Sequence, residues 1–235
     1  QDIPRFVEMN VADVGFTGFD IVSELKSNVD IIMDLDFGRC DMVVAVKEED
    51  DYNCSNDLPQ NIKVATSFPN IAKEYFEKLG KKPQIIEVSG ATEITPRLGL
   101  SDVVVDITSS GATLKSNKLR IIDNILSSSA IIIASKNLSE VKQRKLSSLL
   151  RALKSVIDSK GKKYLMAHVP KNALNQIKAF LPGLSSPTVT SLLDDDKNVV
   201  IHVVVDEDEV YESIDKLKNL GGRGILIMTV EQMVA

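Results

Sequence analysis

The sequence is short of the residues around which many functional sites are built. It has no tryptophan, two histidines and two cysteines among 235 residues. The cysteines, Cys40 and Cys54, form no CxxC pair and have no histidine near them in the sequence, so neither a disulfide framework nor a zinc site is indicated. Such sparse cysteine usage is typical of a reducing compartment, and we expect a cytoplasmic protein.

Long apolar runs and excess positive charge are also missing. No run of 18 apolar residues occurs, so we expect neither a membrane-spanning helix nor a signal peptide. The net charge is -5 and the basic residues are scattered, which argues against a nucleic-acid surface. Neither the P-loop pattern nor GxGxxG is present, so ATP hydrolysis and a Rossmann dinucleotide site are not supported.

Strand-like apolar runs alternate with helical patterns over the first 160 residues. Asn70 is suited to cap a helix that ends near Leu79, and residues 139–159 carry the longest helical stripe of apolar side chains. The alternation predicts an α/β fold with a largely parallel sheet and helices on its faces. Strands are expected at residues 11–16, 30–36, 42–46, 62–66, 84–88, 103–107, 120–126 and 130–134.

The last 75 residues have a pattern of their own. Strands are expected at residues 164–169, 188–193, 199–205 and 224–228, with helices at 170–181 and 208–220. This order, β-α-β-β-α-β, is that of the ferredoxin-like split motif.

The most informative stretch is VVVDITSSGATL, residues 103–114, in which a buried-looking strand ends close to Asp106. Small and hydroxyl-bearing residues follow it: Thr108, Ser109, Ser110, Gly111, Ala112 and Thr113. Backbone amides in such a turn can approach an anion closely, so the stretch predicts a phosphate site, with Asp106 suited to a sugar hydroxyl or a magnesium-bound water. An ordinary strand-to-helix turn has a similar composition, and the residues alone leave that alternative open.

A second candidate is ADVGFTGFD, residues 12–20. Thr17 stands between two glycines at the end of a strand, and Asp20 follows. Strand ends of this kind lie at the edge of an α/β sheet where ligands bind. A tight turn with Asp20 as a helix cap fits the same residues.

Five segments, DIPRFVE, ADVGFTGFD, VATSFPNIAKEYF, GATEITPRLGLSD and VVDITSSGATLKSN, occur in this order and resemble the ATP phosphoribosyltransferases of histidine biosynthesis. VPKNALNQIKAFLPGLSSPTV and KLKNLGGRGILI resemble the regulatory domain of the family's long form. The resemblance implies a catalytic part with two lobes, like type II periplasmic binding proteins, and a C-terminal ferredoxin-like domain. The expected ranges are 1–41 with 137–160 for the first lobe, 42–136 for the second, and 161–235 for the regulatory domain.

The resemblance also implies a reaction, in which N1 of ATP attacks C1 of phosphoribosyl pyrophosphate and pyrophosphate leaves, with Mg2+ present. It places the donor's 5-phosphate on residues 108–113, Asp106 near the ribose, Thr17 and Asp20 near ATP, and Glu93 in the cleft. Positioning and magnesium can supply most of the rate enhancement, so no nucleophilic side chain and no metal ligand from the protein is expected.

In the family's long form, histidine is a feedback inhibitor and the enzyme is a hexamer built from dimers. The matching effector positions here are Leu184, Ser186, Thr188 and Gly224. The chain departs from the family in having Phe68 where many relatives have tyrosine, and in lacking an acidic residue within residues 166–169. The family's opening strand and basic loop would lie upstream of the first residue, and we expect them to be missing from this sequence.

One alternative of another class is a two-lobed binding or effector-sensing protein without catalysis. A weaker one is a regulatory protein in which only the histidine-sensing tail is active.

Overall fold

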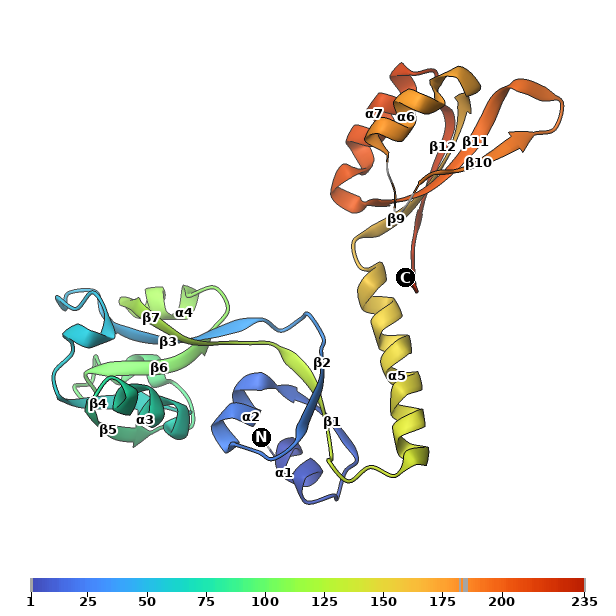
Figure 1. Ribbon diagram of the computed structural model, residues 1–235. Helices are drawn as coiled ribbons and strands as arrows, with labels where there is room; N and C mark the ends of the chain where they lie inside the picture. Colours follow the sequence, from blue (N-terminus) through green and yellow to red (C-terminus); the bar gives the residue numbers. More distant parts are fainter. Residues whose placement is uncertain (1, 182, 184–185, 235) are drawn as a thin grey trace. The chain divides into compact units, whose positions relative to one another are not determined.

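The computed structural model describes residues 2–181, 183 and 186–234, which form two compact units, Gln1–Lys145 and Leu146–Ala235 (Figure 1). No helix among these described residues is long and apolar enough to cross a membrane. Within the described residues, the first unit contains two sheets and the second contains one.

A three-stranded antiparallel sheet forms what we call the small lobe of the first unit. Its strands are β1 (Val14–Gly18), β8 (Ala130–Ala134) and β2 (Asp30–Asp34), in the order β1-β8-β2. The helices α1 (Ile3–Glu8) and α2 (Phe19–Leu25) belong to the same lobe. A small apolar cluster joins these helices to the central strand, through Val7, Val22, Ile131 and Ile133.

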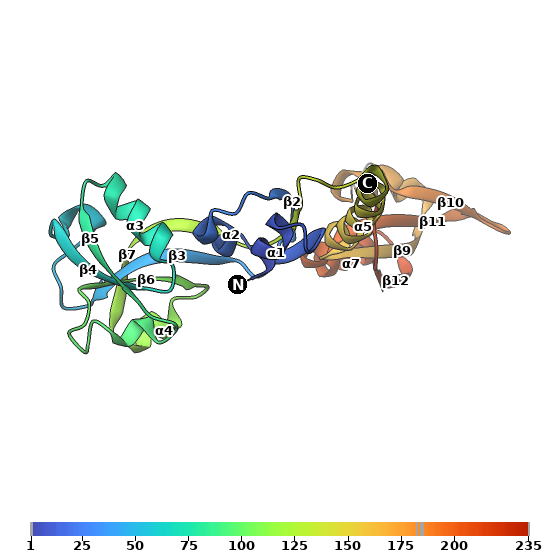
Figure 2. The same ribbon diagram turned by 90° about the horizontal axis from the view of Figure 1, so that it is seen from below.

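A five-stranded sheet forms the large lobe. Its order is β5 (Lys82–Glu87), β4 (Asn61–Thr66), β6 (Val103–Thr108), β3 (Cys40–Lys47) and β7 (Leu119–Ser128). The helices α3 (Pro69–Lys78) and α4 (Ala112–Ser116) lie on opposite faces of this sheet (Figure 2). Alternation along each strand sends Val105 into the cluster beneath α3 and Val104 into the cluster beneath α4. Two short 3-10 turns, Ser55–Asp57 and Thr92–Ile94, complete the lobe.

The prediction of a largely parallel sheet is wrong. Only the pairings of β4 with β5 and of β4 with β6 are parallel, whereas β3 runs antiparallel to both β6 and β7. The reason is that the chain enters the large lobe from the small lobe along β3 and returns along β7. A buried strand of β-branched residues has the same apolar pattern in either direction, so the sequence could not distinguish the two.

The return crossing also differs from the expected lobe boundary at residue 136. Strand β7 belongs to the large lobe and β8 to the small lobe, and only Ser129 separates them. The crossing is marked only by the three serines 127–129, between two apolar runs, and no glycine or proline shows where the chain changes lobe. At the next boundary, helix α5 (Glu140–Ser159), expected in the first lobe, starts in the first unit and ends in the second.

The strand directions bring polar chain segments to one edge of the large sheet. The carboxyl ends of β4, β5 and β6 share that edge because these strands are parallel. Thr108, near the end of β6, pairs with Asp41 at the start of β3, and Asp41 pairs with Ser127 near the end of β7. The chain also crosses to the small lobe here. Ligands of α/β proteins bind at such an edge, outside the carboxyl ends of the parallel strands.

The second unit contains a four-stranded antiparallel sheet in the order β10 (Thr188–Leu192), β11 (Asp195–Asp206), β9 (Lys162–Pro170) and β12 (Arg223–Thr229). Helices α6 (Leu174–Phe180) and α7 (Val210–Asn219) cover one face of it (Figure 1), and each is preceded by a 3-10 turn, Lys171–Ala173 and Glu207–Glu209. Leu165, Ile177, Ile201 and Leu217 form the centre of the core. This arrangement confirms the predicted ferredoxin-like βαββαβ domain.

Candidate functional site

The small-residue turn after β6 has the form that the sequence predicts. Gly111 has φ +71°, a left-handed conformation that glycine adopts without steric cost, and α4 begins at Ala112. The side chains of Ser109, Ser110, Ala112 and Thr113 are exposed. The Thr108 hydroxyl accepts the N–H of Gly111 at 2.8 Å, and the Ser110 hydroxyl accepts that of Ala112 at 3.4 Å. A phosphate bound by these amides must therefore replace the turn's own hydroxyl groups.

Asp106 lies just before this turn and is half-buried. Its Oδ1 accepts the N–H of Ile107 at 2.8 Å, and its Oδ2 accepts the hydroxyl of Thr92. Glu93, the predicted cleft residue, follows Thr92 on the same 3-10 turn and is also half-buried. Glu93 is therefore the chain neighbour of Thr92, whose hydroxyl bonds to Asp106.

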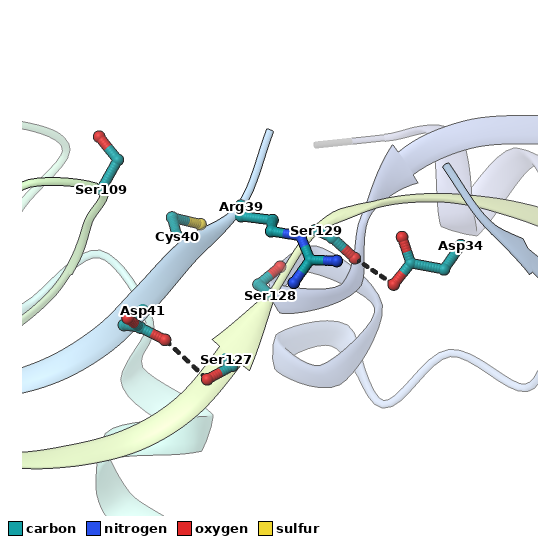
Figure 3. Close-up of a pocket in the computed structure, with 8 residues that line it drawn as sticks. All are labelled: Asp34, Arg39, Cys40, Asp41, Ser109, Ser127, Ser128 and Ser129. Carbon is teal, nitrogen blue, oxygen red and sulfur yellow. Dashed lines mark hydrogen bonds between the residues drawn. The ribbon is translucent and has the colours of Figure 1, made fainter. Parts of the chain in front are cut away.

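A polar pocket of about 340 Å³ lies where the chain crosses between the lobes (Figure 3). We call it the crossing pocket, and it is lined by Asp34, Arg39, Cys40, Asp41, Ser109, Ser127, Ser128 and Ser129. Only Ser109 among these was predicted as a site residue. The run of three serines that ends an apolar strand, with Arg39 and Asp41 at the start of another, is the sequence signal that would have indicated the rest.

Hydrogen bonds keep both carboxylates of the crossing pocket charged. The Ser127 hydroxyl donates to Asp41 at 2.6 Å and, with Asn124, lowers the pKa of that carboxyl. The N–H of Asp36 and the hydroxyl of Ser129 lower the pKa of Asp34 in the same way.

The other two ionisable groups of the pocket have raised pKa values. A hydrogen bond to Asp36 raises the pKa of the Arg39 guanidinium. Burial, followed by the charge of Asp20, raises the pKa of the Cys40 thiol. At neutral pH the pocket therefore has two negative charges, one positive charge and a neutral thiol.

Asp20 is connected to this pocket through Ser128, which lines it. It lies in the first turn of α2 and is 7% exposed. Its N–H donates to the Ser128 hydroxyl at 2.9 Å, and that hydroxyl donates to Asp20 Oδ1 at 2.7 Å. Thr17 is half-buried in β1, opposite Ile131 of the central strand. The two candidate motifs therefore approach one another, because Asp20 of the small lobe bonds to Ser128 of the large lobe, which lines the same pocket as Ser109.

A carboxylate that sequence reasoning missed joins the lobes. The prediction that Asn70 caps α3 is wrong, because Phe68 stands at the N-cap without a side-chain bond. Instead Glu24 of α2, 8% exposed, accepts the N–H of Asn70 at 2.9 Å and that of Ile71 at 3.0 Å. The partners lie 46 and 47 residues apart, so no local pattern could reveal them.

The predicted effector residues lie on two different edges of the second unit's sheet. Ser186 is exposed and Thr188 begins the edge strand β10, while Gly224 lies in the opposite edge strand, β12, against the ring of His168. Leu184 lies outside the described residues. Three strand spacings separate the edges, about 14 Å. One chain therefore does not gather Thr188 and Gly224 into a single pocket.

Comparison with known proteins decides the family. The family model for ATP phosphoribosyltransferase matches residues 1–155, and the model for the C-terminal domain of this family matches residues 159–232. The chain belongs to the ATP phosphoribosyltransferase family. It is 43% identical to the ATP phosphoribosyltransferase of Methanocaldococcus jannaschii, over all of this chain and 83% of that protein. The enzyme of Gemmatimonas aurantiaca is also 43% identical, over all of this chain and 82% of its own length.

Among solved structures, the ATP phosphoribosyl transferase (HisG:HisZ) complex from Thermotoga maritima is similar. It superposes with a TM-score of 0.61 at 32% identity, over 67% of this chain and 76% of that chain. These matches confirm the resemblance drawn from the sequence, and with it the enzyme class. They do not favour the non-catalytic alternatives. They leave the roles of single residues to be argued from the geometry.

Proposed function

We propose that this ATP phosphoribosyltransferase family member transfers the phosphoribosyl group of phosphoribosyl pyrophosphate to N1 of ATP, with release of pyrophosphate, in the first step of histidine biosynthesis. The observation that supports it most is the common edge of the large sheet. There the small-residue turn, the oriented carboxylate of Asp106 and the crossing pocket lie together. We further propose that the reaction takes place in the cytoplasm.

The donor binds first by its phosphate in this proposal. The 5-phosphate occupies the turn 108–113, where it replaces the Thr108 and Ser110 hydroxyls as acceptor for the amides of Gly111 and Ala112. Asp106 has one bond to each carboxylate oxygen, so each oxygen keeps a lone pair for a ribose hydroxyl. These contacts hold C1 of the ribose in place for attack.

The crossing pocket suits the pyrophosphate end of the donor. Ser109 lies in both the turn and the pocket, and Arg39 offers a guanidinium to an anion. Two carboxylates, Asp34 and Asp41, would repel a bare pyrophosphate but fit oxygen ligands of Mg2+. No group of three or more potential metal ligands occurs in the described part of the chain, so the substrate phosphates must supply most of the coordination. Mg2+ bound in this way would neutralise charge on the leaving pyrophosphate.

ATP is proposed to approach from the small lobe, beside Thr17 and Asp20, with Glu93 on the opposite side. The reaction needs no nucleophilic side chain, because N1 of ATP is itself the nucleophile. The protein's contribution is to align N1 with C1 and to stabilise the charges that develop.

A direct experiment mixes the full-length protein with ATP, phosphoribosyl pyrophosphate and Mg2+ and measures release of pyrophosphate. Ser110→Asp should abolish donor binding, because a carboxylate in the turn repels the phosphate. The matched control is Ser116→Asp, the same change at the exposed far end of α4. Absence of pyrophosphate release from the wild type would refute the activity. Unchanged donor affinity in Ser110→Asp would refute the location of the phosphate.

For regulation we propose that histidine inhibits the enzyme at the second unit and that the chain assembles into hexamers from dimers. Because Thr188 and Gly224 lie on opposite edges of one sheet, we propose that the effector binds where edges of two chains meet. Light scattering with and without histidine, beside the pyrophosphate assay, tests both parts. A monomer that histidine inhibits would contradict a site shared between chains.

A further inference from the structure

The connection between β5 and β6 contains a set of buried hydroxyl groups that ends at Asp106. Thr92, Thr95 and Ser101 are 1%, 4% and 5% exposed. The Thr95 hydroxyl donates to the carbonyl of Thr92 at 2.7 Å and lies 2.8 Å from the hydroxyl of Ser101. Since Thr95 has one hydroxyl proton and uses it on Thr92, Ser101 is the donor to Thr95. Thr92 in turn donates its hydroxyl to Asp106 Oδ2.

This set of hydroxyl groups links the two ends of β6. Ser101 lies two residues before the strand begins, and Asp106 lies two residues before it ends. The hydrogen bonds from Ser101 to Asp106 pass through the 3-10 turn Thr92–Ile94, which Thr95 holds in place. Ala91 enters that turn with φ +52°, a left-handed conformation that is unfavourable for alanine. A strained entry and buried polar side chains persist where surrounding contacts fix them, and such features concentrate at functional sites.

We propose that Thr92 is a positioning residue for the phosphoribosyl donor, which acts by fixing the orientation of the Asp106 carboxylate. The proposal rests on the proposed function, in which Asp106 accepts hydroxyls of the donor's ribose. With Ile107 N–H on Oδ1 and Thr92 on Oδ2, both oxygens are fixed and rotation of the carboxylate is blocked. The oxygens then face the ribose before the donor arrives, so less conformational freedom is lost on binding.

Thr92 is placed to act only through Asp106. Its side chain is almost fully buried, so it cannot contact the donor directly. Loss of the hydroxyl should therefore weaken use of the donor and leave the affinity for ATP unchanged.

The test uses the full-length protein and compares Thr92→Val, which keeps the shape and removes the hydroxyl, with Thr92→Ser, which keeps the hydroxyl. A hydrogen bond to a charged group contributes enough that its loss should raise the dissociation constant for phosphoribosyl pyrophosphate about tenfold or more. The KM for the donor should rise, the KM for ATP should stay within about twofold, and Thr92→Ser should restore donor affinity. Thr92→Ala serves as a second variant if Thr92→Val does not fold.

Two further variants separate positioning from general damage. Thr95→Val breaks the hydroxyl chain but leaves the Thr92 donor, so it should change thermal stability more than donor affinity. Asp106→Asn should weaken binding of the donor. Adding Thr92→Val to Asp106→Asn should cause little further loss of donor affinity, because the two side chains act as one unit.

The outcomes distinguish this inference from the proposed function. Full donor affinity in Thr92→Val, with a loss in Asp106→Asn, would overturn the positioning role alone. Equal and independent losses in the two single variants would also overturn it. A wild-type protein that does not bind the donor would overturn the proposed function itself.

Discussion

The two lobes of the first unit are stabilised in different ways. The large lobe has an extensive core in which Met42, Ile62 and Phe76 are fully buried. The small lobe has a cluster of only four buried residues, and it leaves Phe6, Phe16 and Phe37 about half exposed. A cluster this small supplies little hydrophobic stabilisation. We therefore expect the small lobe to depend on its contacts with the large lobe, which include Ile21 of α2 against the large core as well as polar contacts.

Two of those contacts are visible at the lobe boundary. Glu24 accepts the first free amides of α3, and Asp20 exchanges hydrogen bonds with Ser128. Both acids are buried and both come from α2. The position of α2, and so of Asp20 as a proposed ATP contact, is therefore tied to elements of the large lobe.

The largest expected effect is on stability and concerns the apolar cores of the two lobes. Phe76→Ala removes a fully buried ring that packs edge-on against Tyr75, and we expect it to destabilise the large lobe by about 3–5 kcal/mol. Val7→Ala removes two methyl groups from the small cluster and should cost about 1.6 kcal/mol. Native-state hydrogen exchange of peptides from each lobe measures both effects. A Val7→Ala cost equal to that of Phe76→Ala would contradict the comparison.

A smaller effect is expected from the contact between α2 and α3. Glu24→Gln removes a negative charge from the N-terminus of α3 and one of two acceptors, and should cost about 1 kcal/mol. Exchange of the Asn70 and Ile71 amides should become faster. Glu8→Gln is the matched control, because Glu8 accepts the N–H of Asn28 within the small lobe. Equal protection of these two amides in both variants would show that Glu24 does not hold the lobes together.

The smallest effect concerns Cys40 in the crossing pocket. Its raised pKa means that the folded state retains the thiol proton more strongly than the unfolded chain does. The stability from this group is fully present below the unfolded pKa and is lost as pH rises through the folded pKa. In a Cys54→Ser background, alkylation of native Cys40 should require a higher pH than alkylation of urea-unfolded protein. Bound donor with Mg2+ should slow alkylation further.

Mass spectrometry of the alkylated peptide follows this reaction. An unfolded-state profile that matches the native one would contradict the burial of the thiol. Alkylation that the donor does not affect would instead remove the crossing pocket from the proposed site.

Local patterns predicted the elements better than their partners. The turn after β6 was predictable because Gly111 and the hydroxyl residues around it determine its shape over a few residues. The order of the last four strands followed from simple alternation. Strand direction in the large sheet could not be predicted in this way, since β3 and β7 run antiparallel to their neighbours although the alternation of strands and helices favours parallel strands.

Contacts between distant segments could not be predicted from one sequence. Ser128 and Asp20 are 108 residues apart, and Glu24 and Asn70 are 46 apart. Each depends on the path of the chain between the lobes, which crosses at Ser129. The resemblance to a family supplied what periodicity could not, namely the prediction that the two motifs serve one site.

The most direct test is a crystal structure of the full-length protein with phosphoribosyl pyrophosphate and Mg2+. The account predicts the 5-phosphate on the amides of residues 110–113, with Asp106 accepting ribose hydroxyls and the pyrophosphate in the crossing pocket. A donor bound with its 5-phosphate elsewhere, and the Thr108 and Ser110 hydroxyls still on the amides of Gly111 and Ala112, would contradict it.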